Sequence, residues 1–194
     1  HAVITVVNRD DLGDGGAGHY RDCILAVNDR CPSVGLELLC SDLDGDLVSL
    51  GELLDNLPLR VFAHNVECVP RLDSLVRDPR ASFEQSLDIL REARRLRPDI
   101  LIKSSIMVGL GETWNEVMET MDDLRAVDCD LLTVGQYLRP SQKHAPVSRF
   151  YTPQEFADIT KEGMRRGFKR VTAGPLVRSS YHAEDQYSAA STLT

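Results

Sequence analysis

The sequence lacks a long hydrophobic run and an excess of positive charge, and each absence excludes a class of protein. No apolar stretch approaches the ~20 residues that a membrane-spanning helix needs, so we do not expect a membrane protein. Lysine and arginine together number 22 against 30 acidic residues, which gives a formal net charge of −8. Because binding to a nucleic-acid backbone requires concentrated positive charge, we expect no nucleic-acid partner.

The sequence also lacks a CxxC pair, and its number of cysteines is odd. The five cysteines are Cys23, Cys31, Cys40, Cys68 and Cys129. This usage is typical of a reducing cytosol, where most thiols stay free and serve only in packing. It argues against a self-contained zinc or iron–sulfur site within these residues.

Positive charge gathers locally in two places despite the acidic total. The clusters are Arg91, Arg94, Arg95 and Arg97, and then Lys161, Arg165, Arg166, Lys169 and Arg170. The simpler interpretation is that they lie on solvated helix faces. The alternative is that they bind an acidic carrier protein.

Apolar, β-rich runs alternate with segments of helical period along the chain. The predicted strands cover 3–7, 36–40, 61–63, 100–108, 131–137 and 171–173, and helical spacing recurs at 20–27, 50–57, 87–96, 117–127 and 156–164. This alternation predicts an α/β fold with a parallel sheet, as in a partial (β/α) barrel of the TIM type. We expect one core over residues 1–184 and a tail, 185–194, that is poorly ordered beyond its first few residues.

Local signals support the predicted helix ends. Capping-box spacing predicts helix starts at Ser49/Glu52, Thr113/Glu116 and Thr152/Glu155. Pro153 suits a first helical position, and Gly167 suits a helix C-terminus.

Ligands of parallel α/β folds bind at the carboxyl ends of the strands, so polar residues there are the candidates for a site. Asp14, Gly15 and Gly16 lie in the turn-rich stretch after the first strand, where a carboxylate could accept hydrogen bonds and glycines let a ligand approach the backbone. A solvated acidic turn would give the same pattern.

The third strand is followed by His64, Asn65 and Glu67. His64 alone is more typical of a core histidine with satisfied hydrogen bonds than of a ligand. Asn65 and Glu67 form a candidate pair of polar ligands.

The fourth strand carries Lys103 and ends in a glycine-containing turn. Lys103 places a cation in a mostly apolar strand, so it requires an anionic partner from the protein or from a ligand. The turn contains Val108, Gly109, Leu110 and Gly111. Its backbone groups could recognise a planar heterocycle, although an ordinary turn between strand and helix is the simpler interpretation. After the last strand, an arginine, two serines and a tyrosine at 178–181 form a polar segment that could also be a simple C-terminal lid.

Taken together, these segments resemble the lipoyl synthase family of radical S-adenosylmethionine enzymes. The matching stretches are VITVVNRDDLGDGGA, FAHNVECVPR, KSSIMVGLGET, GQYLRPSQKHAPV and GPLVRSSYHA, in the expected order over nearly the whole chain. The RSSY at 178–181 is the most specific of them. Residues 105–112, SIMVGLGE, also look like a superfamily motif that borders the adenine of S-adenosylmethionine.

The resemblance implies an enzyme that inserts two sulfur atoms into a protein-bound octanoyl group. It implies two 4Fe–4S clusters and S-adenosylmethionine as cofactors. The implied partners are an octanoylated lipoyl carrier domain or a glycine cleavage H-type protein, together with an electron donor. The implied location is the cytoplasm, or the mitochondrial matrix in a eukaryote.

The resemblance also suggests roles for individual residues. Ser179 is implied as the non-cysteine ligand of the auxiliary cluster, since a hard alkoxide holds iron more weakly than a soft thiolate does. The implied contacts to S-adenosylmethionine are Asp14, Gly15, Gly16, Asn65, Glu67, Lys103, Val108, Gly109, Leu110 and Gly111. No catalytic side chain is assigned.

The departure from the family pattern is large. Lipoyl synthases carry two cysteine triplets near the N-terminus, and neither appears in this chain. We therefore expect a barrel that lacks its first βα unit, and a polypeptide that is inactive alone. Two alternatives stay open: another radical sulfur-insertion enzyme of the biotin synthase kind, and a non-catalytic fragment that only binds a partner or a carrier domain.

Overall fold

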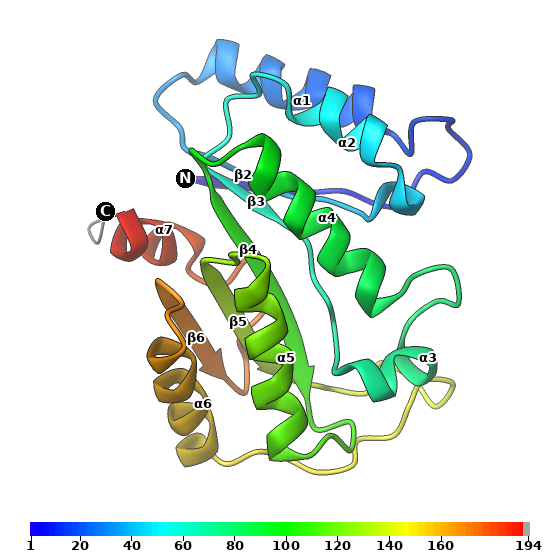
Figure 1. The fold of residues 1–194 in the computed structure, drawn as a ribbon, viewed down its shortest axis with the longest axis vertical. Helices are drawn as coiled ribbons and strands as arrows, with labels where there is room; N and C mark the ends of the chain where they lie inside the picture. The colour runs from blue at the N-terminus through cyan, green and yellow to red at the C-terminus, as the bar shows by residue number, and fades with distance from the viewer. Residues whose placement is uncertain (192–194) are drawn as a thin grey trace.

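Six parallel strands form one curved sheet in the computed structural model, which describes residues 1–191 (Figure 1). The strands are β1 (Ala2–Thr5), β2 (Leu36–Leu39), β3 (Val61–Ala63), β4 (Leu101–Val108), β5 (Leu131–Gln136) and β6 (Arg170–Gly174). Each pairs in parallel with the next one along the chain. The predicted fold class, α/β with a partial parallel barrel, is confirmed.

Helices follow the strands, and most of them cover the convex face of the sheet, while the last one lies on the opposite side (Figure 1). They are α1 (Ala17–Arg30), α2 (Leu47–Leu54), α3 (Asp73–Val76), α4 (Phe83–Leu96), α5 (Trp114–Ala126), α6 (Pro153–Arg165) and α7 (Ala183–Ser191), with short 3-10 turns at Leu43–Gly45 and Pro70–Leu72. Apolar strand residues such as Leu38, Phe62 and Ile102 are fully buried in the main core. Each such side chain contributes about 1.5–3 kcal/mol through burial. Within residues 1–191, no helix combines the length and the apolar character needed to cross a membrane.

Two of the three predicted capping boxes are confirmed, at Thr113/Glu116 and Thr152/Glu155. The third prediction was wrong, because α2 begins earlier than Ser49. The Asp46 carboxylate accepts from the Val48 amide at 2.9 Å and from the Ser49 hydroxyl at 2.6 Å. Ser49 therefore lies inside the first turn, and the aspartate three residues before it takes the capping role.

Of the tail that we predicted at 185–194, residues 192–194 lie outside the described residues, and the described part is helical rather than poorly ordered. Residues up to Ser191 form α7, which lies close to the N-terminus in Figure 1. Ala190 is buried against residues at the amino ends of three strands, namely Val61, Leu101 and Leu131. The Tyr187 hydroxyl accepts from Arg60 at 2.9 Å. Because these strand starts present apolar side chains to the concave face, α7 covers a surface that would otherwise be exposed to water.

A buried ion pair spans the concave face of the sheet above α7. The Lys103 ammonium donates to Glu37 Oε1 at 2.8 Å, and both side chains are 1% exposed. The prediction that Lys103 needs an anionic partner is confirmed, and the partner is a protein carboxylate. Burial raises the pKa of Glu37, and the nearby ammonium offsets this only in part.

Candidate functional site

A cavity of about 230 Å³ opens at the carboxyl ends of β1, β2 and β3. Its lining is mostly polar and includes Asn8, Ser41, Asp42, His64, Asn65, Glu67 and Arg77. Strand ends position these side chains, since Ser41 and Asp42 follow β2 and His64 follows β3 directly. The position is the one at which parallel α/β proteins bind ligands.

His64 forms part of the framework of this cavity. Its Nδ1 lies 3.0 Å from the Cys40 carbonyl oxygen, and its Nε2 lies 2.9 Å from the Ser86 hydroxyl. Complete burial lowers the pKa of His64. Both ring nitrogens are thus engaged within the protein, which confirms the prediction of a satisfied core histidine.

Asn65 and Glu67 bring polar atoms that are not fully used by the protein. The Asn65 amide donates to Glu67 Oε1 at 3.2 Å, while its Oδ1 is buried and has no hydrogen-bond partner among residues 1–191. Burial raises the pKa of Glu67. Its backbone has φ of 67°, a strained value for a residue with a side chain, and its amide and carbonyl bond to Ser105 and Met107 of β4. The buried orphan acceptor makes this pair the best-supported ligand contact of the cavity.

Asp14 lies apart from that cavity and has a local structural role. Its carboxylate accepts from the Gly16 and Gly18 amides at 2.9 and 2.8 Å, which stabilises the start of α1 and lowers the pKa of Asp14. Asp14 lines a separate groove of about 580 Å³ between α1 and α2. Gly15 lines a smaller cavity of about 150 Å³ that shares Ser41 and Asp42 with the main one.

Gly16 has a packing reason to be glycine. Its φ is 91°, and a Cβ atom there would lie 2.6 Å from the Tyr20 hydroxyl oxygen. That hydroxyl donates to the Val7 carbonyl at 2.7 Å. Of the three residues predicted in this turn, the structure places only Gly15 next to the cavity.

The turn after β4 is tightly bound by the protein itself. The buried Glu112 carboxylate accepts from the Gly109 and Leu110 amides at 2.7 and 2.9 Å, and from the Tyr151 hydroxyl at 2.7 Å. The Val108 carbonyl accepts from the Tyr137 amide at 2.8 Å. Most backbone groups that we expected to recognise a heterocycle are therefore already paired. A ligand at this turn could make mainly apolar, shape-dependent contacts.

A second hollow, about 410 Å³ in volume, lies at the carboxyl ends of β4 and β5. We call it the β4–β5 groove. It is lined by Leu75, Val76, Met107, Gln136, Tyr137, Leu138, Pro140, Lys143, His144, Ala145 and Arg178. The half-buried Ser179 directly follows Arg178 in the segment that comes after β6. This segment packs closely on the sheet, since a Cβ at Gly135 would lie 2.3 Å from the Val177 carbonyl oxygen.

The described residues do not by themselves fit an iron–sulfur cluster. Within residues 1–191, no three cysteine, histidine or carboxylate side chains converge as metal ligands would. Cys40, Cys68 and Cys129 are buried, and burial raises the pKa of each thiol to about 12. Such burial is typical of cysteines that serve in packing.

Sequence reasoning missed two groups of residues around these hollows. Arg77, whose side chain is 8% exposed, lines the first cavity and pairs with Asp73. Glu112 and Tyr151 meet although 39 residues separate them. The available signal was the acidic residue close after the glycine turn, because a carboxylate there can accept from free turn amides.

Comparison with known proteins gives the family. The model of the radical SAM superfamily matches residues 3–124. The chain is 51% identical over 184 residues to the lipoyl synthase of Marinobacter nauticus, covering 95% of this chain and 53% of the relative. It is 53% identical over 184 residues to the lipoyl synthase of Halorhodospira halophila, covering 95% of this chain and 55% of the relative.

A third relative, the lipoyl synthase of Staphylococcus aureus strain JH9, is 51% identical over 190 residues, which are 98% of this chain and 62% of the relative. The chain thus spans between 53% and 62% of the length of these relatives. A superfamily match over more than half of the residues, on a sheet of six parallel strands, leads to one conclusion. The chain belongs to the radical SAM superfamily.

Proposed function

We propose that this chain forms part of a lipoyl synthase, which inserts two sulfur atoms into a protein-bound octanoyl group. The observation that carries the proposal is identity of about half of all positions, over nearly the entire chain, to proteins named lipoyl synthase. The three relatives named above are lipoyl synthases, which favours this proposal over a biotin synthase-like enzyme. An octanoylated lipoyl carrier domain or a glycine cleavage H-type protein is the proposed substrate, and an electron donor is a further proposed partner.

The cavity at β1–β3 is the proposed binding site for S-adenosylmethionine. The buried, unpartnered Oδ1 of Asn65 is suited to accept a hydrogen bond from a ligand hydroxyl, and Glu67 beside it offers a second acceptor. Gly15 and the rim of the β4–α5 turn, Val108–Gly111, would border the ligand. When bound and reduced, S-adenosylmethionine supplies a radical that removes hydrogen from unactivated carbons. The protein's own contribution is to orient the ligand and exclude water.

Two of the predicted contacts are not carried into this proposal. Lys103 is engaged by Glu37 on the concave face, and Asp14 is engaged by the first turn of α1. Each side chain thus has a protein partner of its own.

Ser179 remains the proposed ligand of an auxiliary cluster, although the thiolates would have to come from residues that this chain does not contain. The test is made with the full-length polypeptide, reconstituted without oxygen and supplied with an octanoylated carrier peptide. We expect Ser179→Ala to lower lipoyl formation, measured by mass spectrometry, much more than it lowers the release of 5′-deoxyadenosine. Ser180→Ala is the matched control.

The outcomes separate the two claims. Absence of any lipoyl product from the full-length protein would overturn the proposed function. Equal loss of both products in Ser179→Ala would leave that function standing but remove the role of Ser179.

A further inference from the structure

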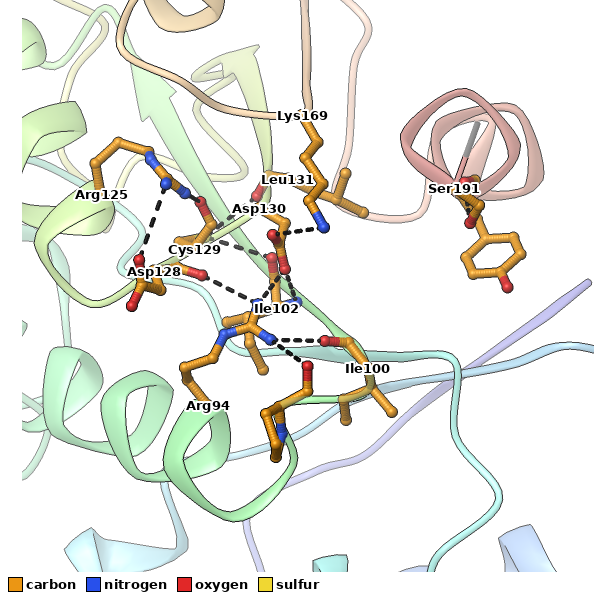
Figure 2. Close-up of polar contacts among 12 residues, drawn as sticks. Arg94, Ile100, Ile102, Arg125, Asp128, Cys129, Asp130, Leu131, Lys169 and Ser191 are labelled. Atoms are coloured by element: carbon orange, nitrogen blue, oxygen red, sulfur yellow. Dashed lines mark hydrogen bonds and ion pairs between the residues drawn. The ribbon is translucent and has the colours of Figure 1, made fainter. Parts of the chain in front are cut away.

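The two basic clusters on the helices are largely neutralised by the protein's own carboxylates. Each arginine of the first cluster forms an ion pair: Arg91 with Asp88, Arg94 with Asp130, Arg95 with Glu92, and Arg97 with Asp99. Figure 2 shows Arg94 and Lys169 converging on Asp130. In the second cluster, Arg165 and Arg166 pair with Glu162. The interpretation of these clusters as solvated helix faces is therefore favoured over the docking of an acidic carrier.

A third basic segment lacks such compensation. From Gln136 to Ser148 the sequence contains Arg139, Lys143 and His144 and no acidic residue, whereas Arg149, which follows, pairs with Glu155 at 2.7 Å. Among the described residues, the Lys143 ammonium has no ion-pair or hydrogen-bond partner. Arg139 donates only to carbonyl oxygens of Gln142 and His144, and Arg178 only to the carbonyl of Val177. In a chain with net charge −8, these cations form an exposed positive surface.

This segment is held at both ends by the turn after β4. At its start, the Tyr137 amide donates to the Val108 carbonyl at 2.8 Å. At its end, the Ser148 amide donates to the Gly109 carbonyl at 2.8 Å, and the Tyr151 hydroxyl donates to Glu112 at 2.7 Å. We call residues 138–147 the pinned basic loop. Because its ends are fixed, its cations keep a defined place beside the β4–β5 groove.

The groove beside the loop combines an apolar floor with a basic rim. Leu75 and Leu138 are 62% and 45% exposed, and Met107 and Ala145 also belong to the lining. Lys143, His144 and Arg178 are the basic side chains in that lining, which contains no carboxylate among the described residues. An aliphatic chain fits such a floor, and an acidic protein surface fits such a rim.

We propose that the pinned basic loop and Arg178 form the docking surface for the acidic face of the acylated carrier protein, with the acyl chain lying in the β4–β5 groove. This inference rests on the proposed function and adds the place at which the carrier binds. The positive charge of the rim favours an acidic partner. The fixed ends of the loop hold the rim at the carboxyl ends of β4 and β5.

The test is a charge reversal, Lys143→Glu, in the full-length reconstituted protein. We expect the KM for an octanoylated carrier domain to rise about fivefold, with kcat and the KM for S-adenosylmethionine unchanged. Higher ionic strength should raise the wild-type KM and shrink the difference. Lys161→Glu, the same change at an exposed site on α6, is the matched control and should leave all constants unchanged.

A short octanoyl-lysine peptide of neutral sequence separates docking from chemistry. Wild type and Lys143→Glu should process this peptide equally, because it lacks an acidic face. Carrier binding by calorimetry, which needs no turnover, tests the surface even if no lipoyl product forms. An unchanged KM and affinity for the carrier, or equal impairment with the peptide, would overturn the inference.

The same variants would also reveal whether another part of the polypeptide, rather than the carrier, occupies the β4–β5 groove. If Lys143→Glu and the milder Lys143→Gln both lose bound iron or unfold, the loop packs against another part of the same polypeptide. That result would overturn carrier docking at this surface.

Discussion

The β1–β3 and β4–β6 halves of the sheet end in hollows of opposite charge. Around the first, the carboxylates of Asp42, Asp44 and Asp46 gather, and the arginines there are already paired, Arg77 with Asp73 and Arg80 with Asp78 and Asp10. Around the second, the described lining contains the basic side chains Lys143, His144 and Arg178 and no carboxylate. S-adenosylmethionine carries a sulfonium and an ammonium group, so an acidic hollow suits it, whereas a basic hollow suits an acidic protein. The same edge of the sheet can thus bind two different ligands, each in the hollow whose charge suits it.

The largest expected effect comes from breaking the ion pair that joins the two halves. Lys103→Met would leave Glu37 buried without its cation, so we expect a loss of about 3–5 kcal/mol in the free energy of unfolding. Urea denaturation followed by circular dichroism measures it. The double variant Glu37→Leu/Lys103→Met should recover most of that loss. A double variant as unstable as the single one would show that the pair is not the cause.

A smaller effect is expected from releasing the pinned basic loop. Tyr151→Phe removes a hydrogen bond to the Glu112 carboxylate and should cost about 1.5–3 kcal/mol of unfolding free energy. Tyr137→Phe is the control, since its hydroxyl donates at 2.9 Å to the neutral carbonyl of Ala145 and should cost only about 1 kcal/mol. Equal losses in the two variants would contradict a special role for the carboxylate.

The smallest effect is a pH dependence that belongs to the β1–β3 half. Burial lowers the pKa of His64 below its ordinary value of 6.5. The unfolded chain therefore takes up a proton near pH 6.5 while the folded protein does not, and stability falls as the pH falls below that value. The slope contributed by this group is up to about 1.4 kcal/mol per pH unit.

Thermal unfolding at pH 7.5 and pH 5.5 measures this dependence. His64→Gln should lose less stability than wild type between the two pH values. Identical losses in both proteins would exclude His64 as the source.

Sequence patterns predicted the features of this fold that depend on neighbours along the chain. Strand–helix alternation and the capping boxes at Thr113 and Thr152 are of this kind. The need of Lys103 for an anion was also predictable, because burial of a cation is costly whatever surrounds it. That the anion is Glu37, 66 residues away, depends on the register of β2, β3 and β4.

The candidate site was less predictable for the same reason. Asn65 and Glu67 follow a strand directly, so strand-end logic placed them in the cavity. Asp14 lies in a long turn, where its carboxylate accepts hydrogen bonds from nearby backbone amides instead of facing the cavity. The amides of the turn after β4 looked free in the sequence because nothing local showed that Glu112 folds back on them.

The central claim is that the two hollows serve different ligands, and one kinetic matrix tests it directly. The KM values for S-adenosylmethionine and for the octanoylated carrier are measured for Asn65→Ala and Lys143→Glu in the full-length protein. The account predicts that Asn65→Ala raises only the first constant and Lys143→Glu only the second. The account would be contradicted if each variant raised both KM values, or if each raised only the KM of the other ligand.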